Sequence, residues 1–158
     1  MRQKNVFTVD EIKKKLEYYC VYQDRCHQEV EKKLQEYQLI PEAREKILLH
    51  LFQENFLNEE RFSKSFARGK FRIKKYGKQR IVKELKYRGI SAYNIKTALK
   101  EIDDDEYVIT ANLLIEKKKD SLNESNVIIK RKKITDYMLR KGYEYNLIQE
   151  IINNGLVK

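Results

Sequence analysis

The sequence is poor in residues that interrupt or cross-link a chain, with one proline, five glycines, two cysteines and no tryptophan among 158 residues. So little proline and glycine leaves no low-complexity linker. Runs that alternate apolar and polar residues between Asn-Gly turns are also missing, which argues against a β-sheet. Leucine, isoleucine, lysine and glutamate dominate instead. The composition therefore predicts an all-α protein.

Signals for export and for membranes are missing as well. The segment from Met1 to Val6 has no apolar core after its charges, so we expect no signal peptide. No run approaches eighteen apolar residues, so we expect no membrane span. Cys20 and Cys26 lie six residues apart, and the pair Cys26-His27 lacks a second pair of ligands at metal spacing. The sequence predicts a cytoplasmic protein with two reduced thiols and no zinc.

Catalytic motifs are the third absence. The sequence has no glycine-rich phosphate loop, no GxSxG and no HExxH. Its two histidines offer few general bases. The acidic cluster from Asp103 to Glu106 has the composition of a helix start, where acids stabilise the macrodipole. We therefore expect no enzyme, no cofactor and no metal.

The sequence does contain one spacing pattern that occurs three times. The copies are Ile134-x3-Met138-x3-Gly142-Tyr143-x4-Ile148-x3-Ile152, then Ile81-x3-Leu85-x3-Gly89-Ile90-x4-Ile95-x3-Leu99, and a fainter Val30-x3-Leu34-x3-Gln38-Leu39. The anchors Gln38, Gly89 and Gly142 are 51 and 53 residues apart. A period near fifty with helical spacing inside each unit indicates a repeat array. We predict three tandem three-helix repeats, residues 1–57, 58–103 and 104–158, forming a monomer longer than a compact globule.

Capping signals predict nine helices. They cover about residues 8–22, 24–37, 41 onward, 58–76, 78–88, 91–102, 104–118, 121–142 and 145–153. Pro41 suits a first helical position, and Ser121-x-x-Glu124 has the spacing of a capping box. Gly89 and Gly142 follow their helices, where a left-handed residue is needed.

Positive charge is concentrated in the second repeat. The net charge is +10, and the segment from Arg61 to Arg88 holds twelve Lys or Arg against one acid, Glu84. On the fourth helix an apolar line is predicted opposite a basic stripe. The apolar line comprises Phe62, Phe66, Gly69, Ile73 and Tyr76, and the stripe comprises Arg61, Lys64, Arg68, Arg72 and Lys75. Gly69 would be explained by a close helix crossing.

Two further sets of cations extend this predicted surface. They are Lys78, Arg80 and Lys83 at the start of the next helix, and Lys130, Arg131, Lys132 and Lys133 in the third repeat. A surface of this kind attracts polyanions, mainly through counterion release. A plain solvated face is the alternative, although such faces usually mix Glu with Lys. A base-reading helix-turn-helix around Gly89 is another alternative, with Tyr93, Asn94, Lys96 and Thr97 facing the groove; its tandem recurrence favours a structural repeat.

Several motifs in fixed order resemble the RecX family, bacterial regulators of the RecA recombinase. They are Phe56-Leu57-Asn58-Glu59-Glu60-Arg61-Phe62, Tyr76-Gly77-Lys78, Arg88-Gly89-Ile90-Ser91 and Met138-Leu139-Arg140-Lys141-Gly142-Tyr143. The resemblance covers the chain from about Asp10, with Gln38 standing where a glycine is common.

The resemblance implies a curved array without catalytic activity of its own. It implies binding to the RecA–single-stranded DNA filament, in its groove, with suppression of ATP hydrolysis and strand exchange. The rival hypothesis is an autonomous helical nucleic-acid-binding protein with DNA as its sole partner. A recombinase regulator should act at low stoichiometry, whereas a DNA binder should act only in proportion to the DNA that it covers.

Overall fold

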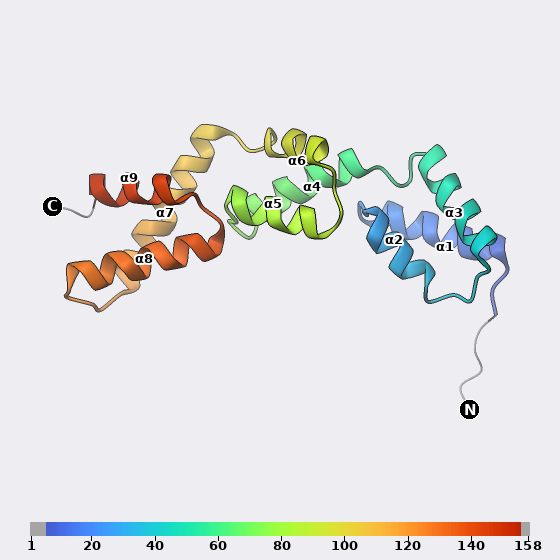
Figure 1. Cartoon of the computed structure of the whole chain (residues 1–158), viewed down its shortest axis with the longest axis horizontal. Helices are drawn as coiled ribbons and strands as arrows, with labels where there is room; N and C mark the ends of the chain where they lie inside the picture. The colour runs from blue at the N-terminus through green and yellow to red at the C-terminus, as the bar shows by residue number, and fades with distance from the viewer. Residues whose placement is uncertain (1–5, 156–158) are drawn as a thin grey trace, which may run out of the picture.

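The computed structural model describes residues 6–155, which form nine α-helices and no strand (Figure 1). The helices are α1 Val9–Tyr22, α2 His27–Leu34, α3 Pro41–Gln53, α4 Glu59–Arg72, α5 Lys78–Tyr87, α6 Ala92–Leu99, α7 Asp104–Ser121, α8 Val127–Lys141 and α9 Tyr145–Gly155. They follow one another in groups of three along an elongated, curved body, with α1 to α3 at one end and α7 to α9 at the other (Figure 1). The predicted all-α array is confirmed. No helix in residues 6–155 has the length and hydropathy needed to cross a membrane.

Local side-chain caps explain where most helices begin. A side-chain oxygen accepts a backbone N–H three residues ahead at Thr8, Asn58, Ser91 and Asp103. Pro41 is the first residue of α3, as predicted. Gly89 and Gly142 have φ angles of +73° and +104°, the left-handed conformation expected after α5 and α8. These features depend on neighbours in sequence, which is why sequence patterns predicted them.

The predicted start of α8 is wrong. Ser121 is the last residue of α7, and its hydroxyl donates to the Lys118 carbonyl. Asn126 is the N-cap of α8 instead, because its Oδ1 accepts the N–H groups of Ile128 and Ile129 at 3.0 and 3.2 Å. The charged run from Glu116 to Asp120 contains no Gly or Pro that would stop a helix, so α7 continues through Ser121 and the predicted capping box does not form there.

The predicted extent and faces of α4 also need correction. The helix ends at Arg72, and Lys75 beyond it has a φ angle of +59°. Besides Phe62, the buried residues of α4 are Ser63, Ala67 and Phe71, whereas Ile73 is 78% exposed. No atom lies within 4 Å of the position that a Gly69 Cβ would occupy, so a close helix crossing does not explain Gly69. The core wraps around α4 because α5 and α6 both pack on it.

The described residues form two hydrophobic cores, not one core for each of the three predicted repeats. One core belongs to the first repeat and includes Leu16, Leu34 and Leu51. The other runs through the second and third repeats without a break, from Phe62 to Ile152, and it also takes in Cys26 of the first repeat. The second and third repeats therefore form one packed body. The division into 1–57, 58–103 and 104–158 stays a proposal about the repeating unit.

The joint between the second and third repeats is built from backbone and aromatic contacts. Gly77 N–H donates to the Lys141 carbonyl at 2.8 Å, and Gln79 N–H donates to the Gly142 carbonyl at 3.0 Å. A Cβ on Gly77 would lie 2.2 Å from the Gly142 backbone, so only glycine permits this approach. The Tyr107 and Tyr143 rings stack beside it at 5.0 Å. Such contacts hold the two repeats in a fixed orientation.

Candidate functional site

The basic stripe predicted on α4 is largely engaged in ion pairs. Arg61 Nε lies 2.8 Å from Asp24 Oδ1, and the same guanidinium donates to the Asn55 and Phe56 carbonyls. Asp24 was predicted to begin a helix; α2 begins at His27, and Asp24 instead joins the first repeat to the second. Arg61 is therefore a structural link between repeats.

Two more members of the stripe have acidic partners, one inside α4 and one far from it in sequence. Lys64 pairs with Glu60 at 3.1 Å, and Arg68 pairs with Glu101 from beyond α6 at 3.2 Å. Arg72 and Lys75 are exposed and have no carboxylate within 4.0 Å in residues 6–155. The free positive charge of the stripe is thus confined to its C-terminal end, where Lys75 lies beyond the helix.

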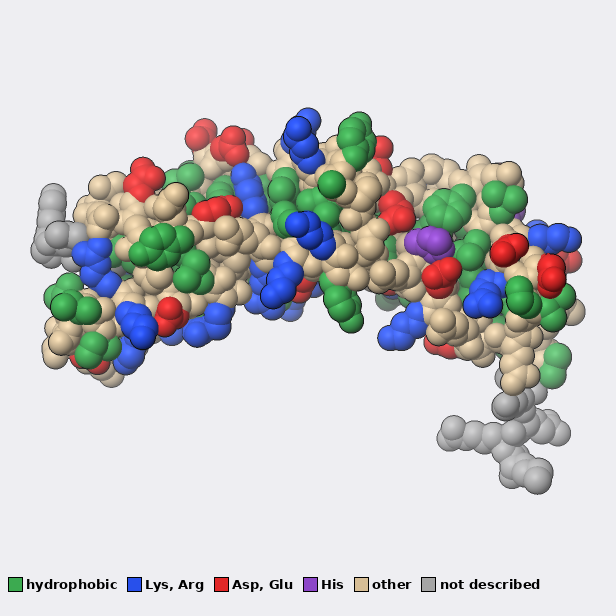
Figure 2. Space-filling view, in the orientation of Figure 1, with side chains coloured by type: hydrophobic (Ala, Val, Ile, Leu, Met, Phe, Trp, Pro, Cys, Tyr) green, Lys and Arg blue, Asp and Glu red, His purple; other side chains and the backbone are tan. Residues whose placement is uncertain are grey.

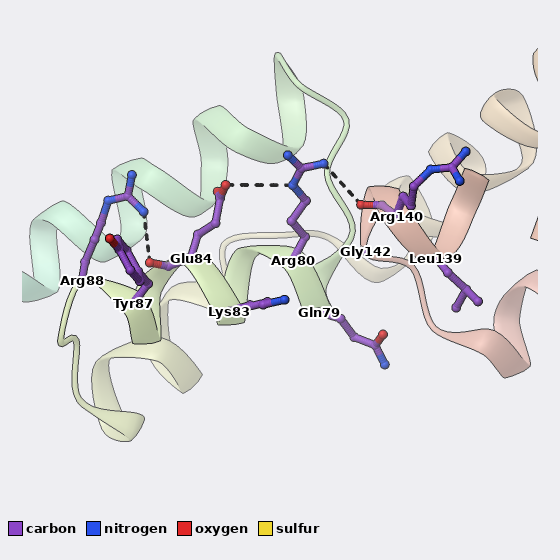
Figure 3. Close-up of a pocket in the computed structure, with 9 residues that line it drawn as sticks. All are labelled: Gln79, Arg80, Lys83, Glu84, Tyr87, Arg88, Leu139, Arg140 and Gly142. Carbon is purple, nitrogen blue, oxygen red and sulfur yellow. Dashed lines mark hydrogen bonds and ion pairs between the residues drawn. The ribbon is translucent and has the colours of Figure 1, made fainter. Parts of the chain in front are cut away.

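A groove of about 840 Å³ separates α5 from the C-terminal end of α8 (Figure 3). We call it the α5–α8 groove; its lining residues are Gln79, Arg80, Lys83, Glu84, Tyr87, Arg88, Leu139, Arg140 and Gly142. Along one side, Arg88 donates to the Glu84 carbonyl, Arg80 approaches the Glu84 carboxylate at 3.9 Å and donates to the Arg140 carbonyl (Figure 3). These contacts hold Arg80 and Arg88 in place as part of the wall.

Lys83 and Arg140 are the cations of the groove that remain available. Both are exposed, and neither has a carboxylate within 4.0 Å in the part of the chain that the structure describes. Tyr87 follows Lys83 by one helical turn and is 83% exposed. An exposed aromatic ring beside unpaired cations is the combination that single-stranded nucleic acids bind, through stacking and phosphate contacts.

Lys78 and the block 130–133 do not line this groove. Lys78 Nζ lies 3.3 Å from Asp104 and 4.6 Å from the Tyr107 ring centroid, at the joint between repeats. In the block 130–133, Arg131 donates to Asn153 and Lys133 pairs with Glu124 at 3.7 Å, while Lys130 and Lys132 have no such partner among the described residues. From Lys130 to Arg140 is about 15 Å along α8. This block therefore does not line the groove.

Lysine and arginine side chains gather along the lower, concave edge over the second and third repeats (Figure 2). Figure 1 shows α5 and the end of α8 side by side along that edge. Sequence reasoning found Arg80 and Lys83 but missed Tyr87, Arg88 and Arg140. The helical spacing from Lys83 to Tyr87 was a usable signal. Nothing in the sequence links Arg140 to α5, sixty residues earlier.

The titratable core residues stay neutral at physiological pH. Burial raises the pKa of the Cys20 thiol to about 11 and also raises the pKa of Cys26. Both cysteines are free thiols. Burial, together with a hydrogen bond to Glu144, raises the pKa of Tyr107 far above its usual value. No group of three His, Cys, Asp or Glu within residues 6–155 has the geometry to hold a metal.

Two parts of the chain match models of one protein family. Residues 58–99 match RecX, second three-helix domain, and residues 104–152 match RecX, third three-helix domain. The regulatory protein RecX of Bacillus cytotoxicus is 28% identical over 131 residues, which are 83% of this chain and 48% of that protein. RecX of Streptococcus uberis is 28% identical over 138 residues, 87% of this chain and 52% of that protein. The chain thus spans about half the length of these curated relatives.

Solved structures agree with these matches. The crystal structure of RecX from Lactobacillus salivarius superposes with a TM-score of 0.81 at 25% identity, covering 92% of this chain and 95% of that one. A second structure, of a regulatory protein RecX, superposes with a TM-score of 0.79 at 21% identity, which is evidence for the fold.

Proposed function

Because this chain belongs to the RecX family, we propose that it is a non-enzymatic regulator that binds the RecA–single-stranded DNA filament and restrains its ATP hydrolysis and strand exchange. The relatives carry the name regulatory protein. Recombination and DNA repair in the cytoplasm would be its setting.

The observation that carries the proposal is the α5–α8 groove on the concave edge of a long body. Lys83 and Arg140 come from different repeats and have no acidic partner within 4.0 Å in residues 6–155. The rigid joint between these repeats fixes their separation, because backbone hydrogen bonds link Gly77 and Gln79 to the end of α8. An extended surface with fixed charges suits a ligand that is itself extended, such as a filament with phosphate and acidic protein along one groove.

Of the predicted surface, we assign contact with the filament to the cations that have neither an acidic partner nor, like Arg131, an amide partner. These are Arg72, Lys75, Lys83, Lys130 and Lys132, with Arg140 and Tyr87 added from the groove. Arg61, Lys64, Arg68, Lys78, Arg80 and Lys133 have carboxylate partners and shape the surface. Exposed pairs of this kind contribute about 0–1 kcal/mol each to stability, so they can reorganise at an interface.

The test is a RecA ATPase assay on single-stranded DNA, titrated with this protein and with a Lys83→Glu, Arg140→Glu double variant. We expect the parent to suppress hydrolysis well below one molecule per recombinase subunit. The double variant should need at least about tenfold more protein, equivalent to about 1.4 kcal/mol. A Lys14→Glu, Lys46→Glu variant is the matched control, since it makes the same charge change at exposed sites of the first repeat.

A protein that binds DNA alone is the second candidate, because Tyr93 and Lys96 on α6 are exposed, as base-reading would require. It would inhibit RecA only in proportion to the DNA covered. Suppression of ATP hydrolysis that rises only in proportion to the DNA covered would count against the filament proposal. So would an equal loss of suppression in the two double variants.

A further inference from the structure

Five lysines line a hollow of about 360 Å³ where the second and third repeats meet. They come from the turn after α4, the last turns of α7 and the end of α8, and we call the hollow the lysine pocket. Its lining residues are Lys74, Lys75, Lys117, Lys118 and Lys141, with Ile73, Leu114, Ser121 and Tyr137. None of the five ammonium groups has a carboxylate within 4.0 Å in residues 6–155. Only Lys75 belongs to the surface predicted from the sequence.

Helix dipoles account for only part of this charge. Three helices, α4, α7 and α8, end near the pocket, and each C-terminus carries about half a negative charge. Together they offset fewer than two of the five lysines. The repulsion is felt by Lys141, whose Nζ donates to the Lys74 carbonyl at 3.1 Å. The pKa of Lys141 is lowered mainly by burial and then by the positive charges of Arg80, Lys117 and Lys74.

The backbone at Lys75 is a second sign that the side chain is needed here. Its φ angle of +59° is left-handed, which costs about 1–2 kcal/mol for a residue with a Cβ. The Tyr143 hydroxyl donates to the Lys75 carbonyl at 3.0 Å and holds the turn. The corresponding turn after α3 has the same φ at Asn55, a residue type that tolerates it. Glycine would remove the strain at Lys75, so strain kept with a charged side chain points to a binding role.

We propose that the lysine pocket binds consecutive phosphate groups of a nucleic-acid strand that also occupies the α5–α8 groove. The inference rests on the proposed function, in which this edge of the molecule meets DNA. Arg80 lines the groove and Lys141 lines the pocket, and both cations lie over the Tyr76 ring, 3.8 and 5.9 Å from its centroid, so the two hollows adjoin at Tyr76. Ammonium groups on flexible stems neutralise phosphates as point charges without reading sequence, whereas bidentate recognition of a single carboxylate or phosphate favours the fork of arginine. All five cations that line the pocket are lysines.

The experiment measures binding of a fluorescein-labelled oligothymidylate by anisotropy, without recombinase, at several salt concentrations. The pocket variant combines Lys75→Gly, Lys117→Ala and Lys118→Ala. Lys75→Gly relieves a strained φ, and Lys117 is exposed, so the fold should persist. The control variant combines Lys14→Ala, Lys32→Ala and Lys46→Ala, three exposed lysines of the first repeat without a carboxylate within 4.0 Å in the described residues.

We expect the pocket variant to bind at least about tenfold more weakly than the control variant. Its log–log salt dependence should flatten by about 0.7 for each phosphate group that the variant no longer neutralises. Equal losses of affinity in the two variants would show an effect of net charge and overturn the proposal.

Inorganic tripolyphosphate serves as the competitor. Displacement of the strand by an equimolar amount would assign the pocket to a small polyphosphate and also overturn it.

The measurements distinguish a failure of the pocket assignment from a failure of the proposed function. If the pocket variant keeps the DNA affinity and salt slope of the parent but no longer suppresses RecA ATP hydrolysis, the pocket meets acidic protein, and this inference fails while the function stands. If the parent binds the strand through the pocket yet leaves RecA unaffected, the function fails and the pocket assignment stands.

Discussion

Gly142 and Gly89 share a left-handed backbone but differ in what surrounds them. A Cβ on Gly142 would lie 2.4 Å from Arg80 Cβ, whereas a Cβ on Gly89 would meet only the end of the Gln28 side chain at 3.1 Å. Gly89→Ala should therefore lower the free energy of unfolding by about 1 kcal/mol, from backbone strain. Gly142→Ala should lower it by at least about 2 kcal/mol, since overpacking adds to the strain. Urea unfolding measures both.

Gly69→Ala is the control at the same scale. Gly69 lies inside α4 with a negative φ and open space around it. Alanine there should raise the free energy of unfolding by about 0.5–1 kcal/mol through helix propensity. A destabilised Gly69→Ala, or equal effects at Gly89 and Gly142, would contradict the contacts described for these residues.

At the scale of the element, single substitutions distinguish the two candidate N-caps of α8, which are Asn126 and Ser121. Asn126→Ala should lower the free energy of unfolding by about 1 kcal/mol, because two backbone N–H groups lose their acceptor. Ser121→Ala should change it by less than about 0.5 kcal/mol, because Ser121 caps no helix N-terminus and loses only an exposed hydrogen bond to the Lys118 carbonyl. Thermal or urea unfolding of the two variants provides the comparison. The reverse order of effects would restore the capping box at Ser121 as the start of the helix.

At the scale of the whole molecule, two cores predict two cooperative units. The first repeat has its own core, while the core of the second and third repeats is continuous. The first repeat is tied to the rest mainly by Arg61–Asp24 at 2.8 Å, Arg88–Glu29 at 3.8 Å and the buried Cys26. Native-state hydrogen exchange should show α4 to α9 opening together, with α1 to α3 opening at a lower free energy.

Arg61→Ala should widen the difference between these units. It removes the ion pair and two hydrogen bonds to the first repeat, so exchange in α1 to α3 should become faster while that in α7 to α9 does not change. A single opening free energy for all nine helices would show instead that the three repeats unfold as one unit.

Local sequence patterns were enough to predict the number of helices, most of their N-terminal caps and the left-handed glycines after α5 and α8. Each of these depends on interactions between residues a few positions apart, which a local pattern records. The fifty-residue period likewise predicted an elongated array, because each repeat packs mainly on its neighbours in sequence.

Which charges are free, and which hollows they form, depends on the tertiary structure. The sequence placed Arg68 on a basic stripe without indicating its partner, because Glu101 lies thirty-three residues away. No sequence pattern links Lys117 and Lys141 to Lys74 and Lys75. Local spacing fixes the face of a helix on which a charge lies. The partner of that charge depends on how helices far apart in sequence pack, and here the packing is set by the close approach of Gly77 to Gly142 and by the stacked tyrosines beside it.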